Sequence, residues 1–284
     1  MRTFSFLLLF VSTTAFSQSL LWKVSGNGLK KPSYLFGTYH ILKDSYLNQN
    51  AKVKTAYEGA EGVVVETEID SSAMLSMAMR GLMLNNSLNK LLSAEDYKLV
   101  ADEFKQRTGY DLGLFNQMKP IVTATMLSLA YVQKESDTLS RFTGLPLDLY
   151  FSSDGRKRQK TVNTLETMEE QMTFLYDHDP VEKQAQQLVE MVKGKAEMYD
   201  LSKSITELYL KQDLQGMWKL NEKHGSSFGD MTYLVDERNR NWMKRLPALI
   251  SIRPTFVAVG ALHLPGPNGL IELLRKEGYK VEPQ

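Results

Sequence analysis

The stretch Ser33-Tyr34-Leu35-Phe36-Gly37-Thr38-Tyr39-His40 (SYLFGTYH), near the amino terminus, decides the fold. Its apolar residues 34–36 predict a buried strand that ends at Gly37, and His40 follows three residues later. A glycine at a strand end lets the backbone turn sharply or approach a ligand closely. Because ligands of open α/β sheets bind beyond the carboxyl ends of the strands, we expect His40 to lie at a ligand site.

The same pattern returns more than two hundred residues later. Residues 255–259 are an apolar run, and Gly260 and His263 follow it with the same spacing. The chain has four histidines, and glycine makes up about 7% of ordinary proteins, so this double match arises by chance in only a few per cent of cases. Either histidine alone could be an ordinary loop residue, but the pair favours a common site.

A carboxylate ends a third predicted strand. Residues 62–66 read GVVVE, so Glu66 follows a β-branched run, and Glu68 lies two residues further on. Either could be the functional carboxylate, and we prefer Glu66. If the three strands run parallel, His40, Glu66 and His263 meet at one edge of the sheet. Two imidazoles and one carboxylate are a known ligand set for a catalytic metal with an open position. Such a metal lowers the pKa of bound water and polarises a carbonyl.

Composition narrows the function classes. The chain of 284 residues has a formal net charge of +1 and no cysteine. Because the chain has no large excess of positive charge, nucleic acid is not an expected partner. Without thiolates, a metal must be held by histidine, carboxylate, amide or water, and we expect a divalent ion such as Mn, Co or Zn. No HExxH motif is present, which excludes a thermolysin-like helix.

Residues 1–17 have the pattern of a secretory signal peptide. Arg2 is followed by a short apolar core, and Ala15-Phe16-Ser17 is a small-x-small cleavage site before Gln18. Nothing later in the chain is long and apolar enough to predict an integral membrane span. We therefore expect an exported protein, periplasmic or extracellular, that consists of one domain over residues 18–284.

Predicted strands gather at the two ends of the chain, and helices fill the middle. This order predicts an α/β (α+β) fold in which the amino- and carboxyl-terminal segments form a mixed central β-sheet around a large helical insertion. The final part of the insertion reads as one long helix over 231–250. The strands are expected at 20–24, 34–36, 62–66, 160–165, 255–259 and 279–282.

Two further charged residues are candidates for the site. Arg238 lies in a helix of mixed character and could clamp a carboxylate or stabilise an oxyanion, whereas Arg240 is expected on a solvated face. Glu166 ends the predicted strand before a helix, so it could either cap that helix or belong to the site.

The motifs together resemble one family. LWKVSG, SYLFGTYH, VVVE, LETMEEQ, ERNRNW and the closing VAVGALHLPGPNGLIELLRKEGYKVE occur in the order found in the TraB/GumN family, over nearly all of the mature chain. That family is similar to the TIKI metalloproteases of animals, and to erythromycin-esterase-like and haem-binding ChaN proteins. The closing block is its most specific part.

The resemblance implies an exported metal-dependent hydrolase, in particular a peptidase acting on a peptide or small-molecule substrate. It carries over His40 and His263 with their motif glycines Gly37 and Gly260, the strand-end Glu66, and the pair Arg238 and Asn239. Asp148 and Glu166 match family positions as well. Tyr39 stands where the family often has a smaller aliphatic residue, which would narrow the site. The alternative is a non-catalytic cell-envelope protein that binds haem, metal or a glycan, or an interaction module whose site has lost its function.

Overall fold

The computed structural model describes residues 19–68, 71–134, 137–225 and 232–284. The predicted signal peptide therefore lies outside the described residues. The α/β class is confirmed: a mixed six-stranded sheet has the order β4-β3-β5-β2-β1-β6. The strands are β1 (Leu21–Gly26), β2 (Ser33–Thr38), β3 (Gly62–Val65), β4 (Thr161–Thr164), β5 (Thr255–Gly260) and β6 (Tyr279–Pro283).

The sheet joins the two ends of the chain. β1 and β2 form the expected antiparallel hairpin, and β6 pairs antiparallel with β1. β2, β5, β3 and β4 are mutually parallel neighbours, with Phe36 opposite Ala258 and Val65 opposite both Ala258 and Thr164. Val63, Val64 and Val257 are fully buried, as expected of β-branched strands covered on both faces.

Helices make up most of the remaining chain. They are α1 (Ala51–Gly59), α2 (Ser71–Arg80), α3 (Leu88–Leu91), α4 (Ala94–Thr108), α5 (Pro120–Lys134), α6 (Asp137–Ser140), α7 (Leu147–Lys157), α8 (Met168–Tyr176), α9 (Val181–Lys193), α10 (Lys195–Leu210), α11 (Leu214–His224), α12 (Arg238–Trp242), α13 (Leu246–Ile252) and α14 (Leu270–Lys276). Short turns of helix are η1 (Asp44–Gln49), η2 (Leu112–Phe115), η4 (Thr232–Glu237) and η5 (Ala261–His263). None of the helices in the described part of the chain could cross a bilayer.

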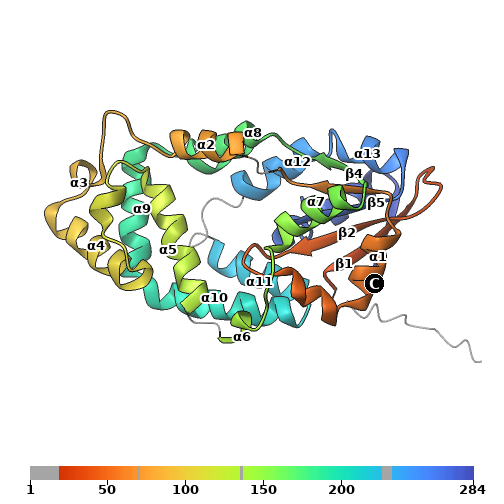
Figure 1. The fold of residues 1–284 in the computed structure, drawn as a ribbon, viewed down its shortest axis with the longest axis horizontal. Coiled ribbons are helices and arrows are strands. Elements are labelled where there is room, and N and C mark those ends of the chain that lie inside the picture. The colour runs from red at the N-terminus through yellow and green to blue at the C-terminus, as the bar shows by residue number, and fades with distance from the viewer. Residues whose placement is uncertain (1–18, 69–70, 135–136, 226–231) are drawn as a thin grey trace, which may run out of the picture.

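The helical insertion has a core of its own. At one end of the molecule α3, α4, α5 and α9 pack around Phe104, Leu127 and Leu188, and at the other end the sheet carries the larger core (Figure 1). Two connections link these ends, α2 with α8 and α10 with α11. α4 illustrates the local signals, because Ser93 accepts a hydrogen bond from the backbone N–H of Asp96 and Gly109 ends the helix at φ +80°.

The single long helix expected over 231–250 is wrong. From residue 232 onward the chain forms the π-helical turn η4, then α12, and after a break α13. Pro247 explains the break, because it has no N–H to donate and is tolerated in the first turn of a helix. π-Helical turns are rare and often occur at functional sites, and this one directly precedes Arg238.

Candidate functional site

Four parallel strands end at one edge of the sheet, and each leads into a candidate residue. β4 leads to Glu166, β3 to Glu66, β5 to Gly260 and His263, and β2 to His40. The strands of His40, Glu66 and His263 thus run parallel, as expected. The side chains gather where α/β sheets bind their ligands.

Glu66 lies at the centre of this group. Its Oε1 accepts a hydrogen bond from the backbone N–H of Gly260 (2.7 Å), and its Oε2 accepts one from Nη2 of Arg238 (2.7 Å). Nε2 of His263 lies 3.9 Å from Oε1. Burial alone would raise the pKa of Glu66, but the field of His263, Arg238 and His40 and the Gly260 N–H outweigh it and lower the pKa to about 2. Glu66 is therefore a carboxylate at neutral pH.

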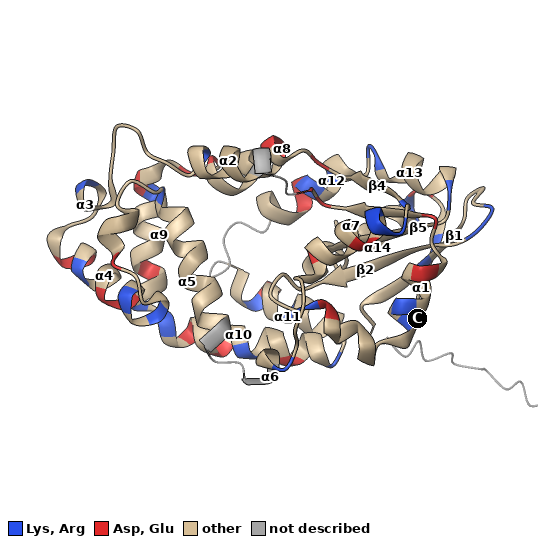
Figure 2. Cartoon of the chain, viewed as in Figure 1, with Lys and Arg blue, Asp and Glu red and all other residues tan. Residues whose placement is uncertain are grey.

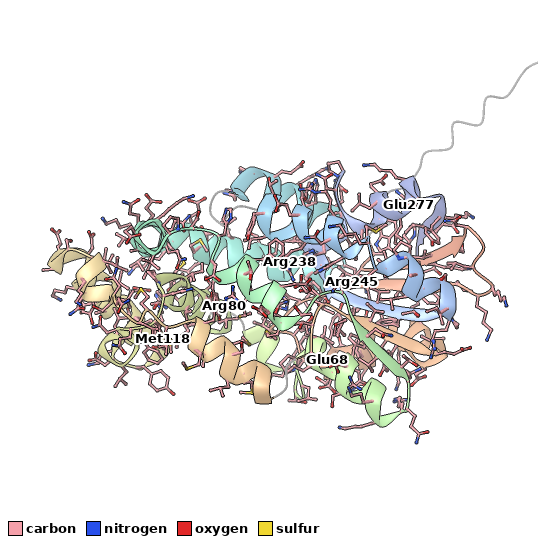
Figure 3. All side chains as sticks on the ribbon, turned by 90° about the horizontal axis from the view of Figure 1, so that it is seen from above. Glu68, Arg80, Met118, Arg238, Arg245 and Glu277 are labelled. Atoms are coloured by element: carbon pink, nitrogen blue, oxygen red, sulfur yellow. The ribbon has the colours of Figure 1, made fainter. Side chains whose placement is uncertain are left out.

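Glu68 points elsewhere. Both of its oxygens accept hydrogen bonds from Arg156, near the end of α7. In Figure 3 its label lies well apart from that of Arg238. β3 ends at Val65, so the alternation of side chains along a strand does not extend to Glu68. Of the two carboxylates, only Glu66 contacts the other candidate residues.

His263 is buried and held in one tautomer. An arginine only donates, so Nε2 accepts from Nη1 of Arg238 (3.2 Å) and Nδ1–H donates to Oδ1 of Asn239 (2.8 Å). The Asn239 amide is itself oriented, because its Nδ2 donates to the carbonyl oxygens of His263 and Asn268. Burial lowers the pKa of His263 to about 3, so the ring is neutral. Asn239 thus positions His263 with the Nε2 lone pair toward Glu66 and Arg238.

His40 is the exposed member of the group, with 68% of its side chain accessible. Its Nδ1 is 2.7 Å from Oδ2 of Asp148, in the first turn of α7, while Oδ1 of Asp148 accepts the hydroxyl of Thr38. The negative Asp148 raises the pKa of His40 to about 9. Asp148 therefore fixes the ring through Nδ1 and leaves Nε2 for the site.

Replacing Asp148 by asparagine is expected to lower the pKa of His40 from about 9 toward the ordinary value of 6.5. The reason is that the charge that favours the imidazolium is removed while a hydrogen-bonding group stays. A proton NMR titration of the imidazole signals measures this shift. Asp154→Asn is the matched control on the same helix, since Asp154 pairs with Arg158 and Tyr57. A His40 pKa that is equal in both variants would contradict the assignment.

Arg238 connects the carboxylates. It is only 6% exposed, and its Nε and Nη2 donate to Glu166 (3.2 and 2.7 Å) besides the bond to Glu66. Glu166 is buried and also accepts from Nε1 of Trp242 (2.9 Å). It is not a helix cap, because Thr167 caps α8 in a capping box with Glu170. Arg240, by contrast, is about half exposed, as expected.

The two motif glycines serve different purposes. A Cβ added to Gly37 would lie 2.9 Å from Cα of Ala261, so Gly37 allows β2 to approach the turn after β5. A Cβ added to Gly260 would lie 3.3 Å from Oε1 of Glu66, 3.5 Å from Cδ2 of His263 and 3.8 Å from Nε2 of His40. Gly260 therefore leaves the space that the three candidate ligands surround.

Alanine at these glycines is expected to separate stability from function. Gly37→Ala should lower the melting temperature, because backbone atoms must move to admit the methyl group. Gly260→Ala should stay close to wild type in stability, since its φ of −51° suits any residue and its tightest contact is a side-chain oxygen. It should nevertheless lose ligand binding and activity, because the methyl group fills the central space. Thermal unfolding and binding assays test this pair, and a Gly260→Ala protein with full activity would contradict it.

Sequence reasoning missed two members of the network. Trp242 packs its ring against His263 with centroids 4.3 Å apart, and Arg238 lies over the same indole. The sequence signal for Trp242 was its position four residues after Arg238, which places both side chains on the same helical face. Thr38 gave no signal, because its contact to Asp148 spans 110 residues. The other two histidines are not in the group: His178 stacks on Tyr233, and His224 pairs with Glu197.

The side chains of the candidate site form a hydrogen-bonded network. Within the described ranges, no group of three or more His, Cys, Asp or Glu side chains is spaced to hold a metal ion. Arg238 instead donates hydrogen bonds to Nε2 of His263 and to Oε2 of Glu66. In Figure 3 Arg238 lies between Met118, at the helical end, and Glu277, at the sheet end.

Comparison with known proteins gives a family match and three relatives. The model of the TraB/PrgY/gumN family matches residues 20–283. Metalloprotease TIKI1 and Metalloprotease TIKI2 of Danio rerio are each 24% identical over 93% of the chain, covering 63% and 60% of their own lengths. Metalloprotease TIKI homolog of Amphimedon queenslandica is 24% identical over 95% of the chain and 62% of its own length. The chain thus spans about three fifths of these relatives. No solved structure gives a significant match.

Proposed function

Because the chain belongs to the TraB/PrgY/gumN family, we propose that it is an exported metal-dependent hydrolase that cleaves peptide bonds. The observation that carries the proposal is the convergence of His40, Glu66 and His263 around the space left by Gly260. The relatives are named metalloproteases, which supports a peptide substrate and dependence on a divalent metal. The identity of the metal, among Mn, Co and Zn, is left to measurement.

By residue type the donors at Gly260 suit such an ion, although their spacing in this structure is not that of a metal site. Nε2 of His40, Oε1 of Glu66 and Nε2 of His263 would hold it, and these are two imidazoles and a carboxylate. Asp148 and Asn239 bind the far nitrogens of the two rings, the support that metal-ligating histidines usually have. To bind the metal, Nε2 of His263 must give up the hydrogen bond that it accepts from Arg238. His40 must also be neutral. When bound, the metal would polarise the scissile carbonyl and lower the pKa of a water molecule.

The remaining residues have roles that need no metal. Arg238, kept in place by Glu166 and Trp242, offers N–H donors beside Glu66 and can stabilise negative charge that develops on the substrate. Asp148 holds His40 in one orientation, so a neutral His40 could accept a proton at Nε2. The bond from Arg238 to His263 also favours a second candidate, hydrolysis with His40 as general base and no metal.

The two glutamates give a matched test of the proposal. Protein spanning residues 18–284 is stripped and reloaded with Mn, Co, Zn or Ca, and bound metal is counted by plasma mass spectrometry alongside a peptide-cleavage screen. We expect Glu66→Gln to lose metal and cleavage and Glu68→Gln to keep both, because Glu68 is paired with Arg156.

Each other outcome points to a specific alternative. Cleavage without bound metal would favour the general-base mechanism. A haem absorption band without cleavage would favour the binding protein. If Glu68→Gln alone abolished binding, the assignment of Glu66 would be wrong.

Export is part of the same proposal. The hydroxyl of Ser19, just past the predicted cleavage site, lies within hydrogen-bonding distance of the backbone oxygens of Leu21 (2.9 Å) and Gln284 (3.0 Å), and Leu20 is buried. Cleavage before Gln18 would keep these contacts of Ser19 and Leu20. Amino-terminal sequencing of the mature protein from the producing cells tests this, and Met1 at the start of the mature chain would contradict it.

A further inference from the structure

Helix α10 carries two buried hydroxyl groups on the side that faces the core. Its exposed residues include the charged Asp200, Lys203 and Glu207, and Figure 2 shows red and blue residues along its length. Thr206 is 5% and Tyr209 0% exposed, and they lie three residues apart on one side of the helix. Because buried hydroxyl groups are normally hydrogen-bonded, the partners of these two show what α10 holds in place.

Both hydroxyl groups contact the first Gly-x-x-His motif. The hydroxyl of Tyr209 donates to the backbone oxygen of Gly37 (2.8 Å). The phenol oxygen of Tyr39 lies 3.0 Å from Oγ1 of Thr206. A threonine hydroxyl has one proton, and that of Thr206 goes to the carbonyl oxygen of Ser202 (2.8 Å), so Tyr39 is the donor in this pair. The rings of Tyr39 and Tyr209 also stack, with centroids 5.2 Å apart.

These contacts hold one end of a turn that presents His40. The backbone N–H of Leu42 donates to the carbonyl oxygen of Tyr39 (2.8 Å), which closes the turn. Leu42 is fully buried, and its own carbonyl oxygen accepts from the N–H of Leu147, at the start of α7 (2.9 Å). The turn is thus fixed on both sides, by α10 at Tyr39 and by α7 at Leu42, and the exposed His40 lies between these two points.

Tyr39 therefore has a different role from the one expected. The sequence predicts that its ring narrows the site, whereas the ring lies against α10. A smaller aliphatic residue at this position could make neither the stacking contact nor the hydrogen bond to Thr206. α10 packs on α5 and α9 of the helical end and on α11, so Tyr39 ties the turn of His40 to the helical insertion (Figure 1).

We propose that Tyr39 and Thr206 are positioning residues, which hold His40 in the place that its chemistry requires. This inference rests on the proposed function, because it assigns the support of a residue of that same site. Asp148 orients the imidazole ring through Nδ1, but that bond does not fix the backbone that carries the ring. The contact with α10 does. Misplacing a reacting group by about 1 Å can lower a rate roughly 10²-fold, so such support matters for catalysis.

Motion of the His40 ring tests the inference without any turnover. Relaxation of the imidazole ¹³Cε1–¹H signals at neutral pH measures this motion, and His40→Ala identifies the signal among the four histidines. Tyr39→Leu should make the ring more mobile than in wild type, because the stacking and the hydrogen bond are both lost. Tyr46→Leu is the matched control, since Tyr46 is buried and also packs on Tyr209 (centroids 5.9 Å apart) but lies outside the turn. Unchanged ring motion in Tyr39→Leu, or equal mobility in both variants, would overturn the inference, even if His40-dependent cleavage is found.

Variants that lose a single hydroxyl group test the hydrogen bond itself. Tyr39→Phe keeps the stacked ring and Thr206→Val keeps a branched side chain, so both should fold. Each should lower kcat for a peptide cleaved in the screen about two- to tenfold with KM unchanged. The double variant should be no slower than either single one, because both changes remove the same bond. Fully additive losses, or a raised KM at unchanged kcat, would overturn the inference. If no peptide is cleaved, the proposed function fails, and the ring motion in Tyr39→Leu and Tyr46→Leu still supports or overturns the positioning role.

Discussion

Replacing Arg238 by methionine is expected to lower the free energy of unfolding by about 3–5 kcal/mol, because two buried carboxylates lose their shared partner. Glu66 and Glu166 have side chains that are 11% and 4% exposed, and both accept hydrogen bonds from this guanidinium. Methionine roughly keeps the length and apolar character of the arginine stem, so lost packing contributes little. Urea unfolding at neutral pH measures the change.

Arg245→Met is the control, because Arg245 pairs with Glu170 at a site where both side chains are 46% exposed. This pair is worth at most about 1 kcal/mol. Adding Glu166→Gln to Arg238→Met should restore part of the stability, since one unpaired charge is removed. An Arg238→Met protein no less stable than Arg245→Met would show that the carboxylates find other partners.

The pH dependence follows from the same pair. The folded pKa of Glu66, about 2, is below its ordinary value of 4.5, so its contribution to stability is present above pH 4.5 and lost as the pH falls through 2. Without Arg238 the folded pKa rises and this contribution shrinks. The difference between wild type and Arg238→Met should therefore be largest at neutral pH and diminish in acid.

Much of the sheet could be predicted from local pattern. Apolar runs that end in glycine or glutamate marked β2, β3 and β5, and β-branched residues identified strands buried on both faces. Parallel pairing was an assumption that the structure confirms. Once the strands are parallel, residues that directly follow them meet at one edge of the sheet. The positions of His40, Glu66 and His263 after their strands were therefore enough to predict that they meet.

The supporting contacts could not be predicted, because they depend on how helices pack on the sheet. Asp148 meets His40 across 108 residues, and Glu166 meets Arg238 across 72. Glu66 and Glu68 differ for the same reason, since Arg156 of α7 lies beside Glu68 only in the folded chain.

Replacing His40 by alanine is expected to reduce hydrolysis by a factor of about 10²–10⁴, the usual contribution of a positioned acid–base group, and to remove a metal ligand. His40 is the better choice of the two histidines for this test. His263 is buried between Asn239, Arg238 and Trp242, so its removal would also disturb the fold.

Because 68% of the His40 side chain is exposed, His40→Ala should keep the fold and lower the free energy of unfolding by at most about 1 kcal/mol, the worth of the exposed ion pair with Asp148. Loss of activity could then not be attributed to unfolding. Metal content per chain, initial cleavage rates and thermal unfolding are compared for wild type, His40→Ala and the control His224→Ala, whose histidine pairs with Glu197 away from the site. Full metal content and activity in His40→Ala would remove this histidine from the site, and with it the functional meaning of the first Gly-x-x-His motif.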